Sequence, residues 1–330
     1  MHHLGMHPEK EPFSIKISGG PDGDVAGNEM ALLIKEFPNT AKIIAITDGT
    51  GTIRDIDGLD HNALMQLFEK GLGIKFYPVE LLSTDSFLLD ITTRKEIDGM
   101  KDTQRLIRNE NGQIIETFIP ASEASNLFRM NLLKIESDLF IPAGGRPRTL
   151  QQANVHDFFN QKGEPTSTAI IEGANLYLTP EARHTLEQKG VIIIKDSSAN
   201  KGGVVCSSFE VLCGLVLPDE EFIENKRQIV DEILLFIESI ALKETRLILK
   251  AAEEYQIEYA KASDLIAEKI NFFSYQILDH LQNVTLSDSI DDPLNQCLLR
   301  HCLPILRKHP ERILKNVPDI HKKAIIASFI

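Results

Sequence analysis

Residues 19–29 read GGPDGDVAGNE and lie between an apolar run at residues 13–18 and a helical pattern that begins at Asn28. Glycines let backbone amides approach a phosphate closely because no Cβ is in the way. A helix that starts directly after such a loop points unpaired N–H groups and a partial positive charge at a bound anion. This placement predicts a dinucleotide-binding loop. Because the spacing is not G-x-G-x-x-G, a plain strand-to-helix turn stays open as the alternative.

Two carboxylates, Asp22 and Asp24, lie inside this loop. A carboxylate beside a phosphate repels it at short range, so neither residue is a suitable phosphate ligand. Short acidic side chains also bond backbone amides in turns. We therefore expect Asp22 and Asp24 to shape the loop.

Short apolar runs alternate with helical patterns up to about residue 200, which is typical of a parallel sheet covered by helices. The predicted strands span residues 13–18, 41–47, 138–141, 168–171 and 191–195. The predicted helices span residues 28–37, 61–70, 122–135, 150–159 and 180–189. The strands are nearly all apolar, as a sheet covered on both faces requires.

Residues 72–120 interrupt this alternation, and the turn at 109–112 predicts a hairpin there. We interpret this stretch as an elaboration of the first domain. After Leu217 the pattern becomes helical, and a second helical run follows at 287–330 with no cover identified for its apolar residues. The sequence therefore predicts a domain at residues 1–217 and an all-helical region at residues 218–330.

The second predicted strand is followed by Asp48, about 25 residues after the glycine-rich loop. Dinucleotide folds commonly place an acid there to bond the adenosine ribose hydroxyls, and an acid disfavours a 2′-phosphate. This position favours NAD over NADP. The alternative is that Asp48 only caps the Gly49–Thr50–Gly51 turn.

Three further predicted strands end in loops of small and polar residues, at 142–146, 172–175 and 196–203. The carboxyl ends of parallel strands meet at one edge of an open sheet, which is where such folds bind ligands. We therefore expect these loops and the glycine-rich loop to form one site.

The composition limits the classes of partner. The chain has 35 basic and 48 acidic residues, a formal net charge of −13, which argues against nucleic acid or an anionic membrane as the main partner. No apolar run approaches the ~20 residues that cross a bilayer, so we expect a cytoplasmic protein that binds small molecules. The spacing of Cys206, Cys213, Cys297 and Cys302 fits no zinc or CxxC pattern. We expect reduced, mostly buried thiols and no metal site.

Five motifs together resemble, in order, the cofactor domain of large NAD-specific glutamate dehydrogenases. They are residues 19–24 (GGPDGD), Thr47-Asp48 with GTI at 51–53 and DGL at 57–59, residues 142–147 (PAGGRP), residues 172–175 (EGAN) and residues 198–204 (SANKGGV). The resemblance extends to about residue 280. It implies a Rossmann-like, doubly wound, mostly parallel sheet followed by an all-helical region.

The resemblance also implies roles for individual residues. Gly20, Gly23 and Gly27 would form the pyrophosphate loop of NAD, and Asp48 would bond the adenosine ribose. The nicotinamide half would lie along Ala143, Gly144 and Asn175, with Asn200, Gly202 and Gly203 lining nicotinamide and substrate. Val204 and Ser207 would contact the substrate, although a serine early in a helix often bonds only its own backbone. Lys201 has two interpretations: a substrate contact, or equally well a solvated surface amine.

Members of the family oxidise L-glutamate to 2-oxoglutarate and ammonia, and we expect a homo-oligomer in the full-length enzyme. Their catalytic lysine and aspartate lie in a substrate domain before the cofactor domain, and no motif here matches them. We expect this chain to bind NAD and to turn over glutamate poorly, as a fragment of a longer enzyme does. The alternatives are a stand-alone nucleotide-binding or interaction module of the same descent, and a dehydrogenase of another amino acid.

Overall fold

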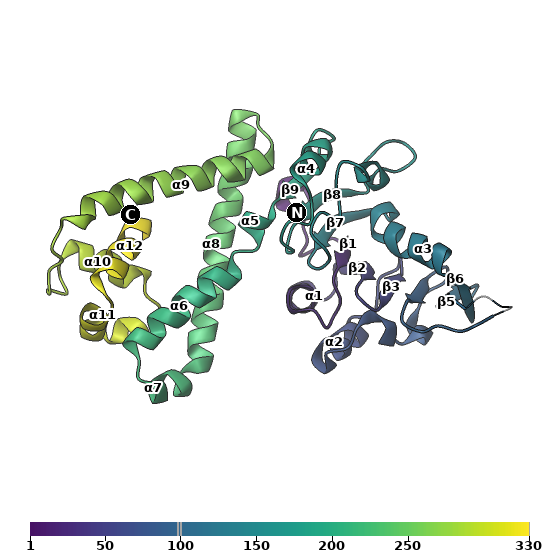
Figure 1. Cartoon of the computed structure of the whole chain (residues 1–330), viewed down its shortest axis with the longest axis horizontal. Helices are drawn as coiled ribbons and strands as arrows, with labels where there is room; N and C mark the ends of the chain where they lie inside the picture. The colour runs from purple at the N-terminus through teal and green to yellow at the C-terminus, as the bar shows by residue number, and fades with distance from the viewer. Residues whose placement is uncertain (98, 100, 330) are drawn as a thin grey trace. The chain divides into compact units, whose positions relative to one another are not determined.

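The computed structural model describes residues 1–97, 99 and 101–329. The chain divides into two compact units, Met1–Ala199 (unit 1) and Asn200–Ile330 (unit 2). Figure 1 shows strands in the first and helices in the second. In the described part of the chain, no helix is both long and apolar enough to cross a membrane.

Unit 1 is built on a nine-stranded sheet whose described strands follow the order β6-β5-β4-β3-β2-β1-β7-β8-β9. The strands are β1 (Phe13–Ser18), β2 (Ala41–Thr47), β3 (Gly51–Arg54), β4 (Phe87–Asp90), β5 (Thr103–Glu110), β6 (Gln113–Pro120), β7 (Ser137–Pro142), β8 (Ser167–Ile171) and β9 (Ile192–Ile194). The pairs from β2 through β1 to β9 are parallel, and those from β2 to β6 are antiparallel. Of the nine described strands, β3 and β5 therefore run opposite to the others, and the mostly parallel α/β fold is confirmed.

Helices cover both faces of this sheet (Figure 1). They are α1 (Asp24–Glu36), α2 (His61–Lys70), α3 (Ala121–Lys134), α4 (Pro180–Glu187) and the short α5 (Asp196–Ala199), with 3-10 turns at His2–Leu4, Ile74–Phe76, Val79–Leu81 and Val155–Phe158. Side chains alternate between the faces of a strand. Accordingly, Ile141 of β7 packs in one core with Met30 of α1, while Phe140 packs in the other with Leu186 of α4.

The helix predicted at residues 150–159 is wrong, because only Val155–Phe158 forms a 3-10 turn. The backbone amide of Leu150 donates to the carbonyl of Tyr177, and Leu150 accepts from the amide of Thr179. These backbone groups serve contacts between two loops, so they are not available to a helix. Helix α1 begins at Asp24, before the predicted start, because the glycine-rich loop itself supplies the first helical turn.

Strands β3 and β4 were not predicted, whereas the hairpin of β5 and β6 around Asn111 and Gly112 is confirmed. Both turn residues have positive φ, 53° and 85°, as a tight hairpin turn requires. The four antiparallel strands extend the sheet on the side of β2, so residues 72–120 are indeed an elaboration of the first domain.

A fully buried lysine lies in the core of unit 1. Lys16 of β1 is 0% exposed, and its Nζ donates to the carbonyl of Ile135 (2.8 Å) and to Oγ1 of Thr166 (2.9 Å). The same Nζ lies 4.4 Å from the ring centre of Phe158. Burial lowers the pKa of Lys16 well below its ordinary value, against the opposing charge of Glu136.

This burial predicts a pH-dependent stability. At pH values between the lowered pKa of Lys16 and the ordinary pKa of lysine, this side chain binds a proton in the unfolded chain but not in the folded chain. The free energy of unfolding therefore rises with pH, by at most ~1.4 kcal/mol per pH unit. Lys16→Met removes this titration. We expect the free energy of unfolding to increase more in the parent chain than in the variant between about pH 7.5 and about pH 9.5, as measured in urea. Equal increases would contradict this explanation.

Unit 2 consists of helices α6 (Gly202–Val216), α7 (Asp219–Glu224), α8 (Lys226–Tyr255), α9 (Tyr259–Gln282), α10 (Pro293–His301), α11 (Pro310–Asn316) and α12 (Asp319–Phe329), with a 3-10 turn at Leu306–Lys308. Its core joins Phe209 of α6, Ile233 of α8 and Leu298 of α10. The apolar residues of the final helical run are thus covered within unit 2 itself.

The sequence-based division places the boundary after Leu217, and the compact units divide after Ala199. The difference is α6, whose Phe209 lies 4.9 Å from the ring of Phe236 on α8 and stacks on His301 of α10 at 5.6 Å. Its apolar face is therefore buried by helices that follow it in the chain.

The four cysteines are free thiols. Cys213 and Cys302 are buried, and burial raises the pKa of these thiols to about 11 and about 12. A high pKa keeps a thiol protonated and unreactive.

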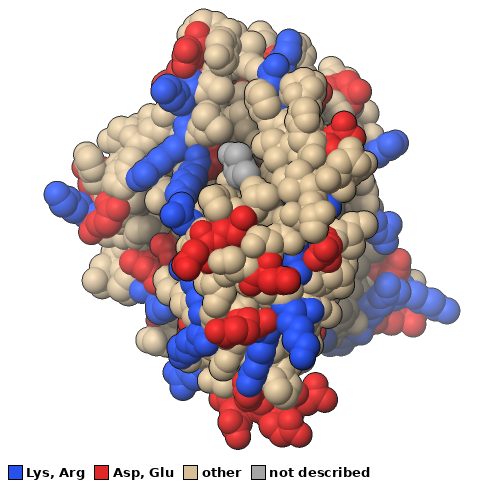
Figure 2. Space-filling model, turned by 90° about the vertical axis from the view of Figure 1, so that its left-hand side faces the viewer, with Lys and Arg blue, Asp and Glu red and all other residues tan. Residues whose placement is uncertain are grey.

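On the face drawn in Figure 2, basic and acidic side chains are interspersed with uncharged ones.

Candidate functional site

The strand order changes direction at β1, because β2 to β6 lie on one side of it and β7 to β9 on the other. From β1 the chain proceeds to β2 on one side, and β7 then pairs with the other side of β1. In open α/β sheets, ligands bind outside the carboxyl ends of the strands at this point. The loops that follow β1 and β7 are therefore the first candidates for a binding site.

These two loops are in direct contact. A Cβ added to Gly19 would lie 2.6 Å from the Cβ of Ala26 and 3.0 Å from the backbone nitrogen of Gly144. Conversely, a Cβ on Gly144 would lie 2.8 Å from the Cα of Gly19. Gly19 also has a φ of +106°, which residues with side chains rarely adopt. The close approach of the two loops therefore requires glycine at both positions.

The glycine-rich loop leads into the N-terminus of α1, which no side chain in the described part of the chain caps. Gly23 is the N-cap residue, and its amide donates to the carbonyl of Gly20 (3.0 Å). The first intrahelical bond of α1 runs from Gly27 to Gly23 (2.8 Å). The preceding N–H groups thus point out of the helix end, where they suit an anion. Asp22 and Asp24 are exposed.

Asp48 lies beside this loop, since a Cβ on Gly20 would fall 2.3 Å from its Oδ2. The side chain is 8% exposed. Its Oδ1 accepts from the amides of Thr50 (2.7 Å) and Gly51 (3.0 Å), and its Oδ2 accepts from the amide of Ile74 (2.7 Å). Asp48 therefore caps the turn after β2, as the alternative interpretation proposed.

The loop after β8 lies against the start of α1 and the end of β7. A Cβ on Gly173 would lie 3.1 Å from Cγ1 of Val25 at the start of α1. The amide of Ala174 donates to the carbonyl of Pro142 at the end of β7 (2.7 Å). The predicted convergence of the strand ends is confirmed for β1, β2, β7 and β8, and it places Ala143 and Gly144 next to the loop that carries Asn175.

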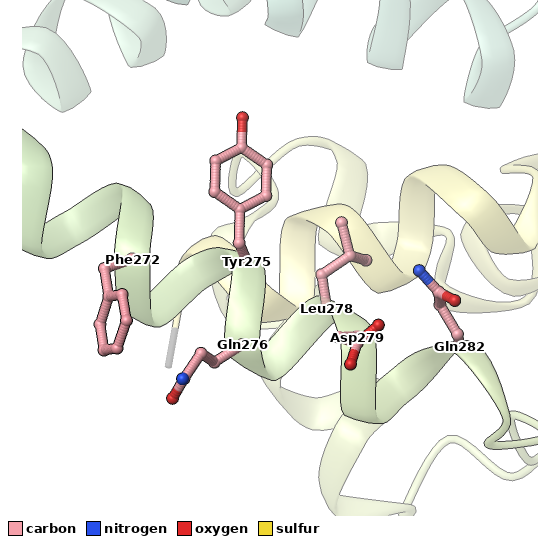
Figure 3. Close-up of a pocket in the computed structure, with 6 residues that line it drawn as sticks. All are labelled: Phe272, Tyr275, Gln276, Leu278, Asp279 and Gln282. Carbon is pink, nitrogen blue, oxygen red and sulfur yellow. The ribbon is translucent and has the colours of Figure 1, made fainter.

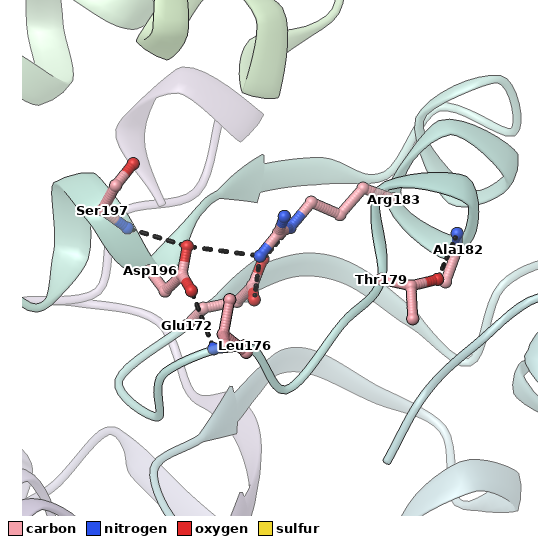
Figure 4. Close-up of polar contacts among 7 residues, drawn as sticks. All are labelled: Glu172, Leu176, Thr179, Ala182, Arg183, Asp196 and Ser197. Atoms are coloured by element: carbon pink, nitrogen blue, oxygen red, sulfur yellow. Dashed lines mark hydrogen bonds and ion pairs between the residues drawn. The ribbon is translucent and has the colours of Figure 1, made fainter. Parts of the chain in front are cut away.

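A buried ionic triad supports this loop (Figure 4). Arg183 of α4 donates through Nε and Nη2 to both oxygens of Glu172 (2.6 and 2.8 Å), and Nη2 also contacts Oδ1 of Asp196 (3.2 Å). Asp196 follows β9, and its Oδ2 accepts from the amide of Leu176 (2.7 Å). Burial raises the pKa of Glu172, opposed by the bonds and charge of Arg183. The triad thus joins the ends of β8 and β9.

The remaining predicted residues belong to unit 2. Asn200, Gly202, Gly203 and Val204 lie at or just before the first turn of α6. A Cβ on Gly202 or Gly203 would meet nothing within 4 Å, so the packing of the chain itself does not require glycine there. Val204 is 73% exposed. Ser207 Oγ donates to the carbonyl of Gly203 (3.0 Å), which is the backbone role considered as its alternative.

Lys201 is not a free surface amine. Its Nζ lies 2.5 Å from Oε1 of Glu244 on α8, so it fastens the start of α6 to the long helix of its own unit. The sequence left its role open between a solvated amine and a substrate contact. In this structure the ammonium group forms an ion pair.

A surface hollow of about 450 Å³ lies elsewhere, on α9. Figure 3 shows that Tyr275 projects away from the helix and that every labelled residue of the hollow comes from this single helix. Ligand sites enclose most of their ligand between several elements. The hollow is therefore a much weaker candidate than the strand ends.

Comparison with known proteins identifies the family of the chain. The family model for Glutamate/Leucine/Phenylalanine/Valine dehydrogenase matches residues 5–269. The chain belongs to this dehydrogenase family. The match includes every loop described above and continues into α9.

Among curated relatives, the chain is 33% identical to glutamate dehydrogenase 2 of Dictyostelium discoideum over 95% of its length and 29% of the relative. It is 32% identical to the NAD-specific glutamate dehydrogenase of Saccharomyces cerevisiae, over 95% of this chain and 28% of that one. The chain thus spans less than a third of these dehydrogenases. A solved hetero-hexameric glutamate dehydrogenase of Thermus thermophilus has a TM-score of 0.46 and 13% identity, covering 79% of this chain and 46% of its own.

Arg183 was not predicted as a candidate residue, and Glu172 and Asp196 were noted only as members of loop motifs. The one available signal is an arginine on the short helix that directly follows the 172–175 loop, and such a residue is more often a solvated surface side chain.

Proposed function

We propose that this chain is the NAD-binding portion of an NAD-dependent glutamate dehydrogenase, which converts L-glutamate, NAD and water to 2-oxoglutarate, ammonia and NADH. The observation that carries the proposal is the contact between Gly19 and Gly144 at the point where the chain reverses its progress across the sheet. Relatives named as NAD-specific glutamate dehydrogenases support the cofactor and the substrate.

The residues present fit a dinucleotide. The pyrophosphate would lie against Gly20, Gly23 and Gly27 at the uncapped N-terminus of α1, where backbone N–H groups and the helix dipole favour an anion. The buried carboxylate of Asp48 lies beside Gly20. A negative charge there repels a 2′-phosphate, which favours NAD over NADP.

NAD supplies a ring that accepts hydride from the α-carbon of glutamate. In the proposed arrangement, Ala143, Gly144 and Asn175 hold the nicotinamide half, and Asn200, Gly202 and Gly203 line nicotinamide and substrate. Val204 and Ser207 are the proposed substrate contacts.

Acid and base catalysis typically contributes ~10²- to 10⁴-fold to a rate. The lysine and aspartate that the resemblance assigns to this chemistry have no counterpart among these 330 residues. We therefore propose that the 330 residues by themselves bind NAD and turn over glutamate poorly. A homo-oligomer is proposed for the full-length enzyme.

Thermal unfolding with added NAD or NADP tests the cofactor assignment. A ligand that binds only the folded state stabilises it by RT ln(1 + [L]/Kd), which is ~2.7 kcal/mol at a hundredfold excess over Kd. We expect a higher melting temperature with NAD and a smaller change with NADP. No change with either nucleotide would end the proposal.

Asp48→Asn tests whether Asp48 is the source of the proposed preference for NAD over NADP. The asparagine oxygen can still accept from the amides of Thr50 and Gly51, but the bond from the amide of Ile74 is lost and the negative charge is gone. We expect weaker NAD binding and a smaller difference between NAD and NADP, measured by titration calorimetry. Asp57→Asn is the matched control, because Asp57 is an exposed residue of a neighbouring loop. An unchanged preference in the Asp48 variant would remove this residue from the site.

A further inference from the structure

The buried triad of Glu172, Arg183 and Asp196 contains two carboxylates and one guanidinium. Each of the three residues is less than a tenth exposed. Removing charges from water is costly, and apolar replacements of buried ion pairs are often as stable or more stable. Stability alone therefore does not account for this arrangement. The geometry that the triad imposes on its surroundings offers a better explanation.

The triad fixes the loop between β8 and α4 at two points. Asp196 accepts from the amide of Leu176 (2.7 Å), and Glu172 accepts from the amide of Leu178. Leu176 has a φ of +58° although it is not a glycine, and its side chain is 59% exposed. Such a conformation persists only where the surrounding structure determines it. Two hydrogen bonds hold Leu176 in this conformation. Its amide donates to Asp196, and its carbonyl accepts from the amide of Arg148 (2.7 Å).

Asn175 immediately precedes this fixed residue, and Ala174 before it is bonded to the end of β7. The backbone on both sides of Asn175 is therefore held. A side chain that contacts a ligand contributes most when its position is set before binding.

We infer that Arg183 is a positioning residue for the nicotinamide half of NAD, which it orients through Glu172 and Asp196 by holding the loop that carries Asn175. This inference rests on the proposed function. In this role Arg183 acts through the two carboxylates and not by contact with the nucleotide. Its planar guanidinium meets both oxygens of Glu172 at once and also reaches Asp196, a geometry that the point charge of lysine cannot reproduce.

The test compares two ligands in the full chain. NAD and ADP-ribose share the adenosine, the pyrophosphate and the second ribose, but ADP-ribose lacks the nicotinamide ring. For Arg183→Lys, which keeps the charge and loses the forked geometry, we expect a Kd for NAD about tenfold higher and a Kd for ADP-ribose within about twofold of the parent chain, by titration calorimetry. Equal losses for both ligands, or none, would overturn the inference.

Arg312→Lys is the matched control. Arg312 forms a bidentate pair with Glu221 in unit 2 (2.7 and 3.1 Å), so the same substitution there should change neither Kd. A tenfold loss of NAD affinity in this control would count against the inference, because it would show that any such lysine variant loses binding.

Leu176→Gly provides a second variant that relieves backbone strain and leaves the triad intact. Glycine adopts positive φ readily, so this variant should fold even if Arg183→Lys does not. Glycine also populates backbone conformations that leucine does not, so the loop around Asn175 is less restricted, and we expect NAD binding to weaken selectively. Unchanged NAD affinity would contradict a role for the held loop. A parent chain that binds neither ligand would instead refute the proposed function.

Discussion

Replacing Gly19 with alanine is expected to destabilise unit 1 by about 2–4 kcal/mol and to abolish measurable NAD binding. Two causes combine. Alanine is strained at a φ of +106°, and its Cβ would come within 2.6 Å of Ala26 and 3.0 Å of Gly144. Relief requires the loop after β1 to separate from the loop after β7, and that separation opens the proposed site.

Gly49→Ala is the control for this prediction. Gly49 lies in the loop after β2, and a Cβ there would meet nothing within 4 Å. Its substitution should change the free energy of unfolding by less than ~0.5 kcal/mol. Urea unfolding followed by circular dichroism measures both variants, and calorimetry measures NAD binding. If Gly19→Ala were as stable as Gly49→Ala, the close approach of the two loops would be wrong.

Arg183→Met is expected to cost about 3–5 kcal/mol of folding free energy, because it leaves two buried carboxylates without a partner charge. Without the guanidinium that opposes them, burial and the charge of Asp196 raise the pKa of Glu172 further above its ordinary value. Groups with a raised folded pKa stabilise the folded state as pH falls. The deficit of Arg183→Met relative to the parent should therefore shrink on acidification from about pH 7 to about pH 5.

Urea unfolding at the two pH values provides the measurement. Arg312→Met in the exposed pair with Glu221 is the control, and it should change stability little at either pH because exposed ion pairs contribute little. A variant at Arg183 that was as stable as the parent, or whose deficit did not depend on pH, would show that Glu172 and Asp196 do not require the guanidinium.

The parallel part of the sheet could be predicted because its strands are continuous apolar runs between loops rich in glycine. Strands β1 and β2 follow the predicted limits, and α2 does as well. Strands β3 and β4 were missed because each has four residues, too few to show an alternating pattern. Strand β3 forms a tight antiparallel pair with β2 and also pairs with β4, which lies more than 30 residues later in the chain.

Helical spacing was misleading at residues 150–159. Val155 and Phe158 are buried there as a helix would bury them, but the backbone of Leu150 bonds to residues 177 and 179. The compact units divide before α6, whereas the sequence-based division places this helix in the first domain. The pattern of α6 resembles that of the helices before it, and only the packing of Phe209 assigns it to unit 2.

The glycine positions of the site could be read from the sequence, since glycine between a strand and a helix has a direct physical meaning. The ionic triad could not, because its three members are 11 and 13 residues apart and come from a loop and two helices. The sequence indicated Asp48 as a candidate, but its bonds to the amides of Thr50, Gly51 and Ile74 depend on how the loop folds.

The central claim is that the ends of β1, β2, β7 and β8 form a single site for NAD. Hydrogen–deuterium exchange of the full chain with and without saturating NAD tests it most directly. We predict slower exchange in four segments together, at residues 19–27, 48–51, 143–146 and 173–176. Protection confined to other segments, or to one of these loops alone, would contradict the account.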